Sequence, residues 1–205
     1  MHHSIKLGFS ANAYLEGGIK LEDTIKKISA FGYEGIEIIA DRPHAFPKDI
    51  MKDPGKIETI KDWLSEYNLA VTNLNANTVF AYSSDRHEPS FIIRKEKYRK
   101  LRIEYTKDCI DLASKLEVNT LCTLSGQCLP IKEEEDKAWE WLVKGLQECV
   151  SYIKSKDRNI KLLIEPHPGF LVESSSDVHR LFEKVEPEYL GIIVVCKNKY
   201  NGITL

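Results

Sequence analysis

A single carboxylate, Glu165, closes the short apolar run Leu162–Ile164 and is followed by the turn sequence Pro166–Gly169. Three apolar residues that stop at a proline- and glycine-rich break predict a buried strand with the acid at its carboxyl end. Parallel α/β folds place their chemistry at that edge of the sheet. Because an acid in this position needs a partner or a cation, we interpret Glu165 as a site residue.

Further polar side chains follow the other predicted strands, and we expect them to contact a substrate at the same edge. The candidates are Asn12, Glu37, His44, Asn73, Asn75, Ser125 and His167. Asn73 and Asn75 are two residues apart and so share one face of a strand, where amides bind hydroxyl groups or cap strand ends. Glu37 supports the site or pairs with a core arginine, and the two histidines contact substrate or lie exposed in loops.

The elements that must position these residues alternate between strand and helix patterns. Strands are predicted at 5–10, 33–40, 69–76, 118–124, 160–165 and 190–195, and helices at 21–31, 57–67, 98–116, 138–153 and 178–185. Loops are expected at 11–20, 41–47 and 77–89, and Ser175 or Ser176 is expected to cap the last helix. Strict alternation predicts a parallel sheet with right-handed crossovers. The chain lacks the glycine-rich phosphate motifs of open sheets, and polar residues follow every strand, which favours a (β/α)8 barrel.

Composition narrows the class of protein. The 205 residues suit one domain, over residues 5–195, with a short polar tail at 196–205. A formal net charge of −2 with interleaved signs disfavours nucleic acid as a partner, and no apolar run reaches the ~20 residues of a membrane span. We therefore expect a cytoplasmic protein. The five cysteines show no paired spacing, so we expect no disulfide framework or zinc site, and Cys109 and Cys149 are expected in the core.

Several motifs together resemble the xylose isomerase-like TIM barrels, the sugar phosphate isomerase/epimerase group. The motifs are Phe9–Tyr14, Gly32–Ile38, Asp41–Pro47, Asp111–Ala113 and Glu165–Gly169. The resemblance covers nearly the whole chain but only the first six of the eight strands that this fold has. We therefore expect an incomplete (β/α)8 barrel of about six β/α units.

The resemblance implies aldose/ketose isomerisation or epimerisation by proton transfer, with a divalent metal (Mn, Mg, Co or Zn) that polarises the sugar's oxygens. The family ligands are a Glu after strand five, an Asp after strand six, a His after strand seven and a Glu after strand eight. Glu165 matches the first of these. Val195 and Asn198 stand where an acid and a histidine are expected, and the last two strands have no counterpart. We expect weak or no metal binding by a monomer.

Two functions remain open at this point. The first is an impaired sugar isomerase/epimerase that acts on a small carbohydrate or sugar phosphate, and the second is an inactive, truncated relative that binds sugar or phosphate weakly. The related AP endonucleases use several histidine ligands, whereas His44, His87 and His167 are few and scattered. Six parallel strands cannot close a barrel, so we expect a homo-oligomer that pairs exposed edge strands.

Overall fold

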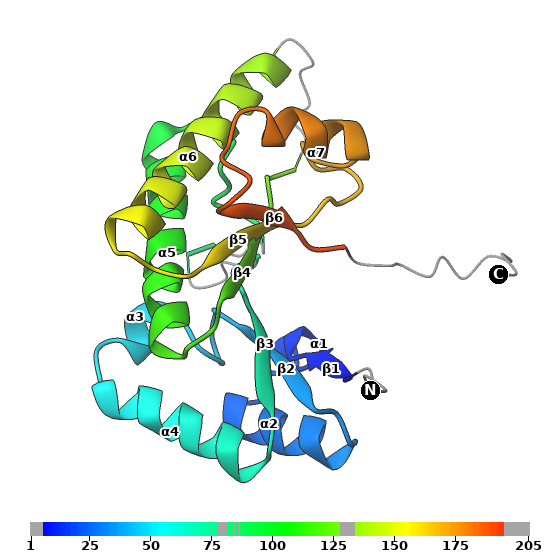
Figure 1. Ribbon diagram of the computed structural model, residues 1–205, viewed down its shortest axis with the longest axis vertical. Coiled ribbons are helices and arrows are strands. Elements are labelled where there is room, and N and C mark those ends of the chain that lie inside the picture. Colours follow the sequence, from blue (N-terminus) through cyan, green and yellow to red (C-terminus); the bar gives the residue numbers. More distant parts are fainter. Residues whose placement is uncertain (1–5, 78–81, 84, 86, 128–133, 195–205) are drawn as a thin grey trace, which may run out of the picture.

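The computed structural model contains a six-stranded parallel sheet in the order β1-β2-β3-β4-β5-β6 (Figure 1). It describes residues 6–77, 82–83, 85, 87–127 and 134–194. The strands are β1 (Gly8–Ser10), β2 (Gly35–Ile39), β3 (Ala70–Asn75), β4 (Thr120–Thr123), β5 (Lys161–Ile164) and β6 (Leu190–Ile192). Each strand pairs in parallel with its neighbours along the chain, which leaves β1 and β6 at the two edges. The predicted alternation and the incomplete barrel of six units are confirmed.

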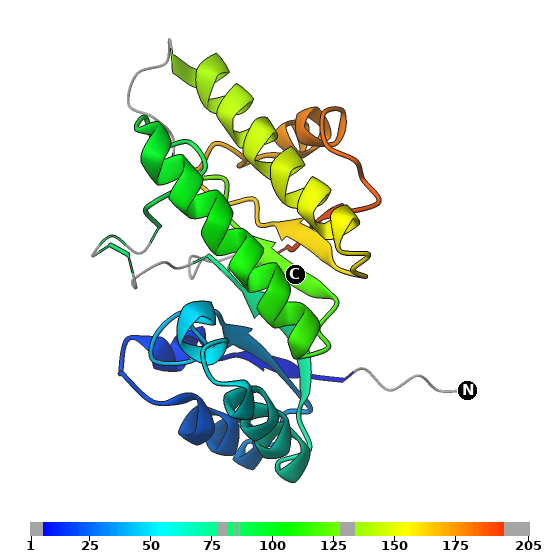
Figure 2. The same cartoon turned by 90° about the vertical axis from the view of Figure 1, so that its left-hand side faces the viewer.

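Helices connect the strands and cover one face of the sheet. They are α1 (Asn12–Leu15), α2 (Leu21–Ala30), α3 (Pro47–Ile50), α4 (Pro54–Glu66), α5 (Glu96–Lys115), α6 (Glu135–Ser155) and α7 (Ser175–Phe182). The long helices α5 and α6 lie side by side against the sheet in both views (Figures 1 and 2). Cys109 of α5 and Cys149 of α6 are fully buried between the layers, as expected. No helix among the described residues is long and apolar enough to cross a membrane.

The two faces of the sheet differ in polarity, and β5 shows the difference most directly. Leu162 and Ile164 are fully buried on the helix side. Lys161, Leu163 and Glu165 project to the opposite, concave side. Lys161 is exposed there, and the other two side chains are half-buried. Because side chains alternate across a strand, Glu37 of β2 and Asn73 and Asn75 of β3 meet on one side of the sheet. This alternation brings these three candidate residues together.

Three local features differ from the sequence expectations. Asn12–Leu15 forms a helical turn where a loop was expected, and Pro47–Ile50 adds another turn directly after the predicted 41–47 loop. The cap of α7 is Ser174 rather than Ser175 or Ser176, because Ser174 and Asp177 form a reciprocal capping box. The predicted tail, together with parts of the 77–89 loop, lies outside the described residues.

Candidate functional site

Glu37 lies at the centre of a hydrogen-bond network on the concave side of the sheet. Its Oε1 accepts hydrogen bonds from the Ser10 hydroxyl at 2.6 Å and from Asn75 Nδ2 at 3.0 Å, and its Oε2 accepts one from Asn73 Nδ2 at 2.8 Å. Both asparagines therefore project from the same face of β3, as their spacing predicts. A longer contact comes from the Cys122 thiol of β4, 3.9 Å from Oε2, so the partners of Glu37 are amides, a hydroxyl and a thiol rather than the core arginine that the sequence left open. Three donors from β1 and β3 fix this carboxylate in place.

A second set of contacts joins this network to Glu165. The Oδ1 atom of Asn75 accepts a hydrogen bond from the backbone N–H of Asn77 at 2.9 Å. Asn77 Nδ2 then donates to Glu165 Oε2 at 2.6 Å. The structure thus contains a continuous chain of hydrogen bonds from Glu37 to Glu165, which crosses the sheet from β2 to the carboxyl end of β5. Bonds to a charged carboxylate are the stronger kind and restrict its orientation.

Three other predicted residues lie at the carboxyl edge in supporting positions. The buried Ser125 hydroxyl accepts a hydrogen bond from the backbone N–H of Val172 at 3.1 Å and so anchors the segment after β5. His167 Nδ1 lies 3.0 Å from the carbonyl oxygen of Pro168, and its ring contacts Phe170. Asn12 is exposed at the start of α1, where its backbone N–H donates to the Ser10 hydroxyl at 3.3 Å.

His44 lies elsewhere. Its Nε2 donates to the carbonyl oxygen of Ile19 at 3.0 Å and lies 3.4 Å from the Thr24 hydroxyl, on the helix side of β2. The side chain is buried, and this burial lowers the pKa of His44, which keeps the ring neutral at pH 7. The structure does not bring His44 together with Glu37 and Glu165.

Sequence reasoning missed two residues that support the edge of the sheet. Asn77 is the bridge to Glu165, and its position directly after the predicted third strand is the only sequence feature that could have identified it. Arg102 is fully buried between the rings of Phe91 and Tyr105. It donates to the carbonyl oxygen of Ala76 at 2.7 Å and to the Thr123 hydroxyl, which ties together the ends of β3 and β4.

A third missed residue is Glu88, in the segment between β3 and α5. Burial raises the pKa of its carboxyl group, although the backbone N–H of Ser90 donates to it at 2.8 Å and the Ser90 hydroxyl at 3.1 Å. No local pattern around Glu88 distinguishes this acid from an exposed loop carboxylate.

The described residues do not supply a complete set of metal ligands. Within the described ranges no group of three His, Cys, Asp or Glu side chains converges on one point. Asn77 Oδ1 is buried without a hydrogen-bond partner among the described residues, and it belongs to the same amide group that contacts Glu165. One carboxylate and one amide oxygen fall short of the three or more protein ligands that a tight divalent site has.

Comparisons with known proteins agree with the fold. Fructoselysine 3-epimerase of Shigella flexneri is 25% identical over 187 residues, which are 87% of this chain and 62% of the relative. The structure of a D-tagatose 3-epimerase-like protein superimposes with a TM-score of 0.73 and 20% identity over 93% of this chain and 64% of that one. The IOLI protein, solved with a zinc atom, gives a TM-score of 0.67 and 17% identity over 92% and 62% of the two chains.

The chain spans less than two thirds of the length of these relatives. The profile of the xylose isomerase-like TIM barrels matches residues 25–198, and the structural neighbours include sugar epimerases. A match over so much of the sequence, together with the six parallel β/α units, places the chain in the xylose isomerase-like TIM barrel family.

Proposed function

We propose that the chain binds a small ketose at the carboxyl edge of its sheet and that Glu165 is the carboxylate that moves the proton in an epimerase- or isomerase-type reaction. The observation that carries the proposal is the position of Glu165 at the end of β5, held by Asn77 Nδ2 at 2.6 Å. Glu37 is the alternative base, but it already accepts three hydrogen bonds from neighbouring strands. The names of the relatives support a ketose as the substrate class.

The chemistry requires a base beside a carbon that neighbours a carbonyl group. A carboxylate removes the proton from that carbon, the electron pair moves onto the carbonyl oxygen, and the resulting enediolate is reprotonated. Reprotonation on the same face restores the original sugar, whereas inversion needs a second acid on the opposite face. Among the described residues the second carboxylate on this side, Glu37, is held by its hydrogen bonds to β1 and β3, so the expected reaction of the chain alone is proton exchange with solvent.

The test is to incubate the purified chain with D-tagatose or D-fructose in D2O and to follow the proton at C3 by NMR. We expect slow loss of the C3 proton signal with the wild-type chain and none with Glu165→Gln, which keeps the shape of the side chain. Glu173→Gln is the matched control, because Glu173 is an exposed acid in the segment after β5. The measurement is repeated with added Mn²⁺ and with EDTA. Exchange that persists in Glu165→Gln would exclude Glu165 as the base.

The second candidate function is carbohydrate binding without catalysis. It is supported by the incomplete set of metal ligands among the described residues. Line broadening or shifts of the ketose signals without any C3 exchange would select this function over the first. A sugar phosphate is the remaining substrate class, and the same titration with fructose 6-phosphate distinguishes it. The absence of both exchange and binding would contradict both candidates.

We also propose that the chain self-associates through its edge strands. β1 and β6 each have one neighbour in the sheet, and the apolar side chains Leu7, Ile192 and Val194 are exposed near these edges. Unpaired strand edges with apolar flanks are templates for pairing with a second chain.

A further inference from the structure

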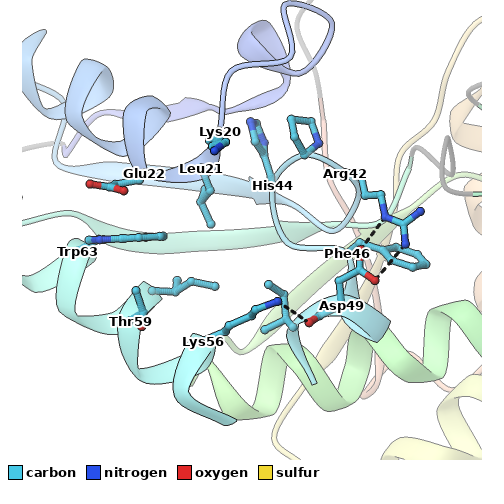
Figure 3. A pocket seen from close by; sticks show the side chains of 13 residues that line it. Lys20, Leu21, Glu22, Arg42, His44, Phe46, Asp49, Lys56, Thr59 and Trp63 are labelled. Atoms are coloured by element: carbon cyan, nitrogen blue, oxygen red, sulfur yellow. Dashed lines mark hydrogen bonds and ion pairs between the residues drawn. The ribbon is translucent and has the colours of Figure 1, made fainter. Parts of the chain in front are cut away.

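A groove lies in the helix layer, between α2, α3 and α4, and is separate from the carboxylate site (Figure 3). We call it the α2–α4 groove. Its volume is about 460 Å³, and neither Glu37 nor Glu165 lines it. The apolar part of the lining includes Leu21, Phe46, Ile50, Ile60 and Trp63. A concave, mostly apolar site of this size suits a small organic molecule.

Two of the charged side chains that line the groove are neutralised by an ion pair, and a third pairs with a residue just outside. Arg42 forms a two-point contact with Asp49, at 2.6 and 3.0 Å. Glu22 pairs with Lys26, the next turn along α2, at 2.6 Å. Both acids of the groove therefore have a cationic partner, and neither supplies a free negative charge to a ligand.

Two lysines that line the groove, Lys20 and Lys56, form no ion pair within the part of the chain that the structure describes. Lys20 precedes α2, and its ammonium group makes no hydrogen bond or ion pair with any residue that the structure describes. Lys56 of α4 donates to the backbone carbonyl oxygen of Asp49 at 3.2 Å, an uncharged partner. The two lysines extend from opposite sides of the groove, one from the α2 side and one from the α4 side (Figure 3). The groove thus combines an apolar floor with a rim that carries three cationic side chains, Lys20, Arg42 and Lys56, and only two acids, Glu22 and Asp49.

From this combination we propose that the α2–α4 groove binds a small organic anion that carries a carboxylate on a flat apolar body. The apolar body would pack on the floor and against the indole of Trp63, where ring stacking adds to the burial of apolar area. The carboxylate would lie at the rim, within reach of Lys20 or Lys56. The proposal does not depend on the ketose site, because the two sites share no residue.

The test uses naphthalene-2-carboxylate as the probe and the uncharged naphthalene-2-carboxamide as its neutral counterpart. The readout is the indole N–H signal of Trp63 in a ¹⁵N-labelled chain, assigned with Trp63→Phe. Trp139 and Trp141 lie on α6 and serve as internal references. We expect a saturable shift of the Trp63 signal alone. Lys20→Glu and Lys56→Glu should each weaken binding roughly three- to fivefold, as expected for exposed charge pairs.

Lys27→Glu is the matched control, because Lys27 is exposed on α2 and does not line the groove. It should leave the affinity unchanged. Equal affinity for the carboxylate and the amide, or equal losses in all three lysine variants, would overturn the assignment of an anion. A shift of all three tryptophan signals, or of none, would overturn the site itself. Deuterium exchange of a ketose should be unaffected in the three lysine variants.

Discussion

The two carboxylates on the concave side of the sheet are held in different ways. Glu37 lies within β2 and accepts hydrogen bonds from β1 on one side and from β3 on the other. Glu165 lies one residue beyond β5, and Asn77 reaches it from the segment after β3. One carboxylate is enclosed by paired strands, whereas the other lies at the end of a strand, next to the sheet edge formed by β6. The same residue type therefore holds neighbouring strands together in one region, whereas in the other it lies at the strand end where we propose that it acts as the base.

The proposed base follows the fifth strand, yet the hydrogen bonds that orient it begin in the first three strands. The amide groups of Asn73 and Asn75 are buried, so they need the acceptor that Glu37 provides. Asn75 in turn orients the backbone of Asn77, which contacts Glu165. The β1–β3 region thus acts as the rigid support for the β5–β6 region. Substitutions can test this division of roles.

The largest decrease in the free energy of unfolding is expected for Glu37→Ala. The substitution leaves the buried amides of Asn73 and Asn75 without their acceptor, and each unsatisfied buried group costs about 1–3 kcal/mol. The free energy of unfolding should fall by about 2–4 kcal/mol. Urea denaturation followed by circular dichroism measures this change.

Two controls accompany Glu37→Ala. Glu34→Ala removes an exposed acid from the same segment, and its effect should stay within about 0.5 kcal/mol. Glu165→Ala should cost clearly less than Glu37→Ala, because Glu165 lies at the end of its strand. Equal losses for Glu37→Ala and Glu165→Ala would refute the contrast between the two regions.

Much of the fold was predictable from local patterns. The apolar spacing of α5 and α6 and the apolar runs of β2 and β5 identified the alternating elements, because burial on one face imposes those periods. The short helices α1 and α3 were not predicted, since a single turn has too few residues to show a period. The cap of α7 was misplaced by one residue because adjacent serines are chemically alike, and only the reciprocal contact with Asp177 selects Ser174.

Part of the candidate site was predictable from one rule, that polar side chains at the carboxyl ends of parallel strands lie at the same edge of the sheet. Glu165, Asn73 and Asn75 follow from that rule, whereas the contact between Asn77 and Glu165 joins residues 88 positions apart in the sequence. A register shift between Ile36 and Glu37 also sets which residue of β3 lies opposite Glu37. His44 lies on the helix side because its ring finds the Ile19 carbonyl, a long-range contact that no local pattern encodes.

A smaller decrease in the free energy of unfolding is expected for Asn77→Ala. This substitution tests the contact that joins the β1–β3 region to the β5–β6 region. It removes the Nδ2 donor to Glu165 but keeps the backbone N–H that binds Asn75. Hydrogen bonds to charged groups contribute about 1.5–3 kcal/mol to stability. Because Glu165 is partly exposed, we expect the loss for Asn77→Ala to lie near the lower value. In a double-mutant cycle with Glu165→Gln, the two substitutions should couple by about 1 kcal/mol. Additive effects of the two substitutions would show that the contact does not link the regions.

The smallest change in free energy is expected for self-association at the edge of the β5–β6 region, where Val194 is 69% exposed. If a second copy pairs with this edge, sedimentation at micromolar concentration should detect dimers, and Val194→Lys should weaken the association roughly fivefold, or about 1 kcal/mol. Phe31→Lys is the control, because Phe31 is 74% exposed at the end of α2 and contributes to neither edge. A wild-type chain that sediments as a monomer would exclude pairing at the sheet edge. Dimers that Phe31→Lys weakens as much as Val194→Lys would place the interface on the helix layer instead.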